Sequence, residues 1–289
     1  MSLFGHARDL ITPSDGSPPV VVAEDRVWVR ASTKREILEI RSEPARVDIT
    51  GLVGGKAGGH LRAALDRWLP AERDAGTPLY LLLDDLSGAS LVANWAWSHW
   101  IENWAAIRNM KMEGVCIGFR PGSRALNGDG TAIQQQSSAH VPPLQHPDDP
   151  QGWHPLADQQ GVGMRRARRI DFWLQDGLLH SDSGFQDSAT YPHGGRIAVH
   201  EYQVTVTANQ PSGEILSLVA DPRVLPYDEC PMAVGTSGRM IGTRLSEMRQ
   251  QVLEKLRATS GCTHLNDALR ALAEGPQLLA ALLRQDKSA

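Results

Sequence analysis

Two stretches decide the expected fold: VWVRASTKREILEIRSEP at residues 27–44 and VTVTANQPSGEILSLVADP at residues 204–222. In both, apolar and polar residues alternate on either side of a polar turn. Successive side chains of a strand point to opposite faces, so this pattern predicts a β-hairpin in each stretch. Both stretches also contain Glu-Ile-Leu and reach a proline six residues later. This shared detail suggests a repeat.

The segments after the two hairpins also correspond. Residues 52–69 and 233–256 are glycine-rich leads into amphipathic helices, and the second helix is expected to be the longer one. Strands grouped before helices are typical of an α+β fold. We therefore expect an internal duplication, in which two halves, each an antiparallel sheet with helices, pack as a pseudo-dimer. Chance similarity between two amphipathic segments is the alternative.

The expected organisation is an N-terminal α+β half at residues 1–112 and a C-terminal α+β half at residues 164–289. The connecting loop at residues 113–163 is rich in Gly, Pro and Gln. Loops of this length are uncommon in compact domains and usually serve as lids or binding loops, or are disordered linkers. Both interpretations are kept for this loop.

The composition is that of a soluble globular protein, with 41% hydrophobic residues, 21% charged residues and a net charge of −4. No long basic run is present, so neither nucleic acid nor a membrane is an expected partner. The sequence has no apolar stretch of membrane-spanning length, and its first ten residues do not resemble a signal peptide. Three cysteines without a C-x-x-C pair indicate free thiols in a reducing compartment. We expect a cytoplasmic protein and leave open whether it forms a homo-oligomer.

Half of the eight tryptophans lie in one stretch, LVANWAWSHWIENWAAI at residues 91–107. On an α-helix Trp97, Trp100 and Trp104 would share one stripe, because residues at i, i+3 and i+7 face the same way. Core packing is one interpretation of such a stripe. The other is a pocket wall for a flat aromatic ligand, with Trp95, Trp97 and Trp153 beside the ring.

One predicted strand of the C-terminal half carries groups suited to acid–base chemistry. His200 and Tyr202 lie on the same face of this strand. His200 is the candidate general base, because an imidazole titrates near neutral pH, and Asp187 would orient it or act as a second acid. Tyr191 or Tyr202 would hold a substrate oxygen, and a turn at Pro-His-Gly-Gly would place His193 at the edge of the site. A hydrogen-bonded structural histidine is the alternative.

Cysteine and histidine occur together near the C-terminus, in GCTHL at residues 261–265. Cys230, Cys262 and His264 are an alternative metal site, although their spacing is not that of common zinc sites. Side chains two residues apart on a helix diverge by about 200°, so a Cys–His nucleophile pair is not expected. The preferred interpretation is a helix start with Thr263 or Ser260 as its N-cap. No cofactor or metal is expected.

Several of these motifs together resemble a known family. RRIDFWLQDG, HEYQVTV, LPYDECP and the long segment from GTRLSEM to GCTHLNDALRAL are similar to the bacterial domain of unknown function 2889. The resemblance covers roughly the last 120 residues. It implies a soluble bacterial protein, often associated with the catabolism of aromatic or polycyclic compounds. It implies no set of catalytic residues.

The leading functional hypothesis is a cofactor-independent lyase that acts on a hydrophobic, phenolic aromatic compound of the lignin type. Proton transfer would break a C–C or C–O bond, as in retro-aldol loss of a small aldehyde or in dehydration. No dinucleotide fingerprint, P-loop or G-x-S-x-G motif is present, and Arg166 or Arg169 would stabilise a phenolate. A hydrolase such as a thioesterase, and a non-catalytic ligand-binding or partner protein, are the alternatives.

Overall fold

The computed structural model describes residues 1–102, 104, 111–133, 136–157 and 159–286. The chain divides into two compact units. Unit 1 consists of Met1–Leu91, His146–His154 and Gln277–Ala289, and unit 2 consists of Val92–Gln145 and Pro155–Pro276. The predicted connector, residues 113–163, therefore contributes to both units. Among the described residues, no helix is long and apolar enough to cross a membrane.

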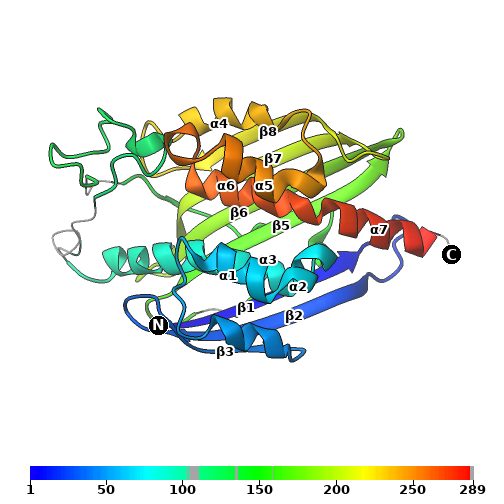
Figure 1. Ribbon diagram of the computed structural model, residues 1–289, viewed down its shortest axis with the longest axis horizontal. Coiled ribbons are helices and arrows are strands. Elements are labelled where there is room, and N and C mark those ends of the chain that lie inside the picture. Colours follow the sequence, from blue (N-terminus) through cyan, green and yellow to red (C-terminus); the bar gives the residue numbers. More distant parts are fainter. Residues whose placement is uncertain (103, 105–110, 134–135, 158, 287–289) are drawn as a thin grey trace. The chain divides into compact units, whose positions relative to one another are not determined.

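Unit 1 contains a three-stranded antiparallel sheet with the strand order β1–β2–β3 (Figure 1). Helical segments follow the sheet in the sequence. The strands are β1 (Ser2–Ile11), β2 (Val20–Ala31) and β3 (Ile37–Glu43), and the helices are η1 (Val47–Leu52), α1 (Leu61–Trp68), α2 (Pro70–Ala75) and α3 (Pro78–Val92).

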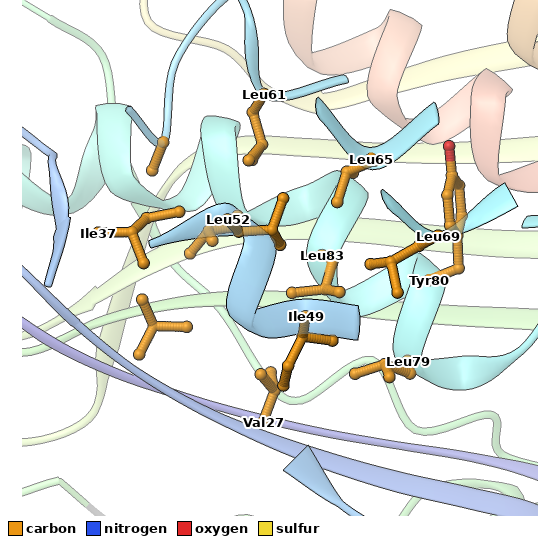
Figure 2. Packing of buried hydrophobic residues seen from close by; sticks show 13 residues of the cluster. Val27, Ile37, Ile49, Leu52, Leu61, Leu65, Leu69, Leu79, Tyr80 and Leu83 are labelled. Atoms are coloured by element: carbon orange, nitrogen blue, oxygen red, sulfur yellow. The ribbon is translucent and has the colours of Figure 1, made fainter. Parts of the chain in front are cut away.

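The core of unit 1 lies between this sheet and its helices (Figure 2). Val27 and Ile37 come from the sheet, and their buried side chains meet leucines of the helices. Leu61 and Leu65 are four residues apart, which places both on the side of α1 that faces the core, and Leu69, the residue after the helix, is buried with them. The alternation of the strand and the period of the helix thus supply one buried cluster.

Unit 2 contains a five-stranded antiparallel sheet. Strand β7 lies between β6 and two shorter partners, because β4 and β8 pair with different ends of its other edge. Strand β5 forms the far edge. The strands are β4 (Ala139–His140), β5 (Met164–Gln175), β6 (Leu178–Thr190), β7 (Arg196–Asn209) and β8 (Ile215–Val224).

Helices α5 and α6 pack against each other, and α6 contacts β6 and β7. The α-helices after the sheet are α4 (Met232–Ser237), α5 (Met248–Lys255), α6 (Thr263–Ala271) and α7 (Gly275–Asp286). The short 3-10 helices are η2 (Ala93–His99), η4 (Ile117–Phe119), η5 (Pro150–Gly152), η6 (Gly238–Met240), η7 (Leu245–Glu247), η8 (Ala258–Ser260) and η9 (Leu272–Glu274).

The structure confirms the α+β class and both predicted hairpins, β2–β3 and β7–β8. The long helix expected within residues 233–256 is wrong. The backbone leaves the helical conformation after Met240, and Gly242 has a φ of 80°, a left-handed value that glycine adopts readily. The next α-helix, α5, has 8 residues and is no longer than α1.

The two hairpins are followed by loops with the same hydrogen bonds. In unit 1 Ile37 N–H donates to Gly55 O over 2.8 Å, and Gly54 N–H donates to Ile37 O over 2.8 Å. In unit 2 the corresponding bonds join Ile215 to Thr243 over 2.9 Å and Gly242 to Ile215 over 2.8 Å. Gly54 and Gly242 also share a left-handed backbone, with φ values of 81° and 80°.

Candidate functional site

A row of polar side chains crosses three neighbouring strands of unit 2. Arg166 on β5 lies opposite Asp187 on β6, and Asp187 lies opposite His200 on β7. Directly opposite residues of antiparallel strands have their side chains on one face, within reach of one another. The register shifts immediately after the Asp187–His200 pair. The sheet therefore gathers a guanidinium, a carboxylate and an imidazole at the start of an irregularity.

Arg166 and Asp187 form a buried, bidentate ion pair. Arg166 Nε–H donates to Asp187 Oδ1 over 2.8 Å, and Nη2–H donates to Oδ2 over 2.9 Å. The side chains of Arg166 and Asp187 are 3% and 0% exposed. A second carboxylate, Asp267 on α6, accepts from Arg166 Nη1–H over 2.8 Å. One guanidinium is thus shared by two carboxylates.

The side chain of His264, on helix α6, lies beside Arg166, Asp187 and His200, and we call this group the buried centre. The imidazole of His264 stacks on that of His200, with ring centroids 3.3 Å apart and an interplanar angle of 17°. Both rings turn a nitrogen towards Asp187 Oδ2, since His200 Nδ1 lies 3.5 Å and His264 Nε2 lies 3.9 Å from this oxygen. The His264 side chain is 15% exposed, so the centre meets solvent at this ring.

The charges of the centre follow from burial and from Arg166. Burial raises the pKa of Asp187, but the charge and hydrogen bonds of Arg166 outweigh it and hold that pKa below the ordinary value of 3.8. Burial lowers the pKa of His200, although Asp187 opposes this shift. Burial, followed by the neighbouring His200, puts the pKa of His264 well below 6.5. Near neutral pH the centre therefore holds an ionised carboxylate and two neutral imidazoles.

Cys262 stands at the opposite side of His264 from Asp187. Its Sγ lies 4.0 Å from His264 Nδ1, so the expected divergence of the two side chains is wrong. Cys262 is itself the N-cap of α6 and has an extended backbone, which removes it from the helical geometry assumed for that expectation. The predicted N-caps Thr263 and Ser260 are wrong for the same reason. Burial raises the pKa of the Cys262 thiol.

Tyr202 is fully buried two residues after His200 on the same face of β7. Among the described residues, its hydroxyl has no hydrogen-bond partner. Burial, followed by the nearby Cys262, raises its pKa well above 10. Cys230 packs in an apolar cluster with Cys116, Phe119 and Tyr227. The structure brings His264 together with Asp187 and His200, and Cys230 is outside this group.

An apolar cluster lies next to the polar row on the same strands. Ala189 and Ile197 form its buried base, one pair beyond Ser188 and Ala198 in the register. Trp95 and Tyr191 pack against this base. Residues two apart on a strand share a face, so Ala189 stands about 7 Å along β6 from Asp187. An aromatic surface thus adjoins the buried carboxylate within one unit.

Tyr191 is surrounded by imidazoles. Its ring centroid lies 5.8 Å from that of His99, 5.1 Å from that of His140 and 5.5 Å from that of His193. Trp95 meets His99 edge to face at 4.7 Å. His193 is exposed in the turn between β6 and β7, where the Pro-His-Gly-Gly pattern predicted it.

The α-helix predicted for the tryptophan stretch is wrong, although Trp97 and Trp104 of the expected stripe lie together, with ring centroids 6.3 Å apart. Helix α3 ends at Val92, and the 3-10 helix η2 continues from Ala93 to His99. Because a 3-10 helix turns by about 120° per residue, the spacing used for an α-helix does not apply. Trp97 and Trp100 are 40% and 37% exposed. Trp100 Nε1–H donates to Thr190 O over 3.1 Å, so this indole binds the end of β6. Residues 103 and 105–107 of the predicted stretch lie outside the described residues.

Two other predicted site residues lie elsewhere. Arg169 is three residues from Arg166 and points to the opposite face of β5, where it binds Asp171, Asp182 and the carbonyl of Leu144. Trp153 belongs to unit 1 and lies beside His154. Asp267 was not predicted. Its spacing of three residues from His264 on a helix is the signal that could have identified it.

Residues 164–276 match a family model described as "Protein of unknown function (DUF2889)". This segment belongs to the DUF2889 family. Arg166, Asp187, His200, His264 and Asp267 all lie within the DUF2889 segment. In searches of curated proteins and of solved structures, nothing matches the chain.

Proposed function

We propose that this chain is a lyase that acts on a hydrophobic, phenolic aromatic compound and works by proton transfer between side chains, without a cofactor. The observation that carries the proposal is the Asp187 carboxylate, ionised and fully buried, facing two neutral imidazoles. A buried base that stays neutral near pH 7 is available to take a proton from a substrate. The adjoining surface of Trp95 and Tyr191 suits a flat aromatic ring.

His200 is the proposed general base. Because Nδ1 faces Asp187, Nε2 is the nitrogen that remains to accept a proton. In a retro-aldol reaction Nε2 would take the proton of a side-chain hydroxyl group, the adjacent C–C bond would break, and a small aldehyde would leave. The electron pair left on the other carbon would then take up a proton. In the alternative C–O cleavage, the base would remove a C–H proton, the C–O bond would break, and the hydroxyl group would leave as water with the proton returned by the protonated imidazole.

The test is turnover of lignin-type phenolics that carry a hydroxylated side chain, followed by release of aldehyde or of the dehydrated product. We expect His200→Gln to lower kcat by about 100-fold or more, the usual contribution of a general base. His180→Gln is the matched control, because His180 also lies on this sheet but stacks on Trp173, away from the polar row. Turnover by His200→Gln at the wild-type rate would overturn the proposal.

A hydrolase such as a thioesterase is the second candidate. It is favoured because His264 lies between a thiol and a carboxylate. Its Nδ1 is 4.0 Å from Cys262 Sγ, and its Nε2 is 3.9 Å from Asp187 Oδ2. The same product screen separates the two reactions, because a thioesterase releases a free thiol and no aldehyde. Binding of an aromatic compound without any product would instead favour a ligand-binding protein.

We also propose that the two units descend from a duplicated segment. The matching loop bonds at Ile37 and Ile215, and the matching left-handed Gly54 and Gly242, support this origin. The first strands of the two hairpins correspond as well, since Val27 and Val29 of β2 are buried like Val204 and Val206 of β7. A family member whose N-terminal region lacks this hairpin and loop, while its C-terminal region has them, would count against the duplication.

A further inference from the structure

We propose that Asp187, His200 and His264 form a binding site for a divalent transition-metal ion. Two imidazoles and one carboxylate are a common set of protein ligands for zinc and for iron(II). Each of the three residues offers one ligand atom, and these atoms lie within 4.8 Å of one another. This site is different from the cysteine-containing set suggested by the sequence, since only His264 is common to both.

The distances suit a single ion. Bonds of about 2.0–2.2 Å from zinc to nitrogen or oxygen place two ligand atoms of one ion roughly 3–4 Å apart. The separations here are 3.5 Å between Asp187 Oδ2 and His200 Nδ1, and 3.9 Å between Asp187 Oδ2 and His264 Nε2. Strands β6 and β7 and helix α6, all in unit 2, hold the three side chains. The backbone thus already gathers the three side chains, and the two stacked imidazoles would have to turn so that their in-plane lone pairs meet at one ion.

The nitrogen of His200 that faces this position makes no well-formed hydrogen bond among the described residues, because Asp187 Oδ2 lies 3.5 Å away. His200 is only 7% exposed, so its Nδ1 is cut off from bulk water. A buried polar atom without a partner is costly and needs an explanation. A metal ion between His200 Nδ1, His264 Nε2 and Asp187 Oδ2 would satisfy this atom. It could enter beside His264, the more exposed of the two rings.

The surrounding charges also allow a cation. Arg166 carries one positive charge, but Asp187 and Asp267 carry two negative charges and both bind it. The neutral imidazoles add none, so the group retains one net negative charge. Carboxylate ligands are commonly held by a further hydrogen-bond partner that fixes their orientation. Arg166 would be this partner, because its guanidinium group donates a hydrogen bond to each oxygen of Asp187.

A bound ion would use the lone pair that the proposed base chemistry requires. If His200 Nδ1 binds the metal, Nε2 carries the proton and cannot accept another one. Metal binding and His200-dependent proton transfer therefore exclude each other in one molecule. The inference therefore concerns a metal-bound form of the chain that is distinct from the cofactor-free form of the proposed function. Binding can be measured without any substrate, so each proposal can fail separately.

The experiment uses the full chain, stripped with a chelator and dialysed, and then titrated with Zn²⁺ or Co²⁺ in a calorimeter. We expect one ion per chain. His200→Gln and His264→Gln should weaken binding by about 100-fold or more, since each removes a direct ligand. His180→Gln should bind like the wild type. Circular dichroism of each variant checks that it is folded.

Cobalt absorption gives a second readout that does not depend on the variants. Nitrogen and oxygen ligands produce weak d–d bands, whereas a thiolate adds an intense charge-transfer band. We expect a spectrum with weak d–d bands only. An intense charge-transfer band would place Cys262 among the ligands and overturn the assignment. Absence of binding by the stripped wild-type chain would overturn it too. Equal binding by folded His200→Gln and the wild type would show an adventitious ion only.

Discussion

Asp187 holds the buried centre together through four contacts. Arg166 donates two hydrogen bonds to it, and His200 and His264 each turn a nitrogen towards its Oδ2. Because the carboxylate is fully buried, water cannot replace any of them. Removing its charge therefore breaks the buried bidentate ion pair with Arg166 and leaves Arg166 paired with Asp267.

We expect Asp187→Asn to lower the free energy of unfolding by about 3 kcal/mol, the lower end of the range for breaking a buried ion pair. Glu39→Gln is a matched control, because Arg30 and Glu39 form an equally bidentate pair on the surface, with side chains 54% and 69% exposed. That change should cost much less, because solvent screens an exposed ion pair. Urea unfolding of both variants measures the difference, and equal losses would contradict it.

Part of this centre was predictable from the sequence. Asp187 and His200 could be selected because an imidazole and a carboxylate near one strand suggest a base and its orienting group. Their direct opposition depends on the register of β6 and β7, which shifts just beyond them. The position of His264 depends on how α6 docks onto the sheet. Neither property is a local pattern, so the stacking of the two histidines could not be predicted.

At the scale of single elements, the start of α6 places both Cys262 and His264. Gly261 precedes it in an extended conformation, and its carbonyl accepts from Ile117 N–H over 2.9 Å. A Cβ at Gly261 would lie 2.3 Å from Leu256 O and 2.9 Å from Asn266 Oδ1. The segment can approach this closely only because residue 261 has no side chain.

We expect Gly261→Ala to destabilise the protein by about 1–3 kcal/mol, because a backbone oxygen must move to admit the methyl group. Gly235→Ala is the control. Gly235 lies in helix α4, and a Cβ at this residue would meet no atom within 4 Å, so alanine should be neutral or stabilise the protein by up to about 1 kcal/mol. Thermal or urea unfolding compares the two, and a neutral Gly261→Ala would contradict the packing described for this segment.

The prediction of secondary structure was correct where the alternation of neighbouring residues determines the structure. Alternation identified the β2–β3 and β7–β8 hairpins, because each strand has one face towards helices and one face away. The pattern failed at the tryptophan stretch, because the apolar spacing of residues 91–107 fits an α-helix while the backbone is 3-10 from Ala93 to His99. Contacts with the sheet, such as that of Trp100 with Thr190, hold this shape. They are tertiary and leave no periodic signal.

At the scale of the whole molecule, both units contain buried histidines whose pKa is lowered. Burial lowers the pKa of His200 and His264 in unit 2, and it lowers that of His154 in unit 1 to about 4. The unfolded chain binds protons at these residues with an ordinary pKa of 6.5. Acid therefore favours the unfolded state, and the stabilising contribution is present above pH 6.5 and lost as the pH falls below it.

We expect the urea midpoint to fall progressively from pH 7.5 to pH 5, because the histidines of both units oppose protonation in this range. Asp187 acts at lower pH, since its contribution is present above 3.8 and is lost as the pH falls through its lower folded value. Urea titrations at four pH values between 7.5 and 5, at constant ionic strength, measure the trend. A midpoint that is constant or rises towards pH 5 would contradict it.

Chemical labelling of the three cysteines can report how often unit 2 opens. Cys116, Cys230 and Cys262 are all buried and all belong to unit 2, and burial raises the pKa of Cys116 to about 11 and that of Cys230 to about 12. A thiol reagent meets a reactive sulfur only during the moments when unit 2 is open. The labelling rate therefore counts these openings in unit 2 alone, without an added probe, because unit 1 contains no cysteine.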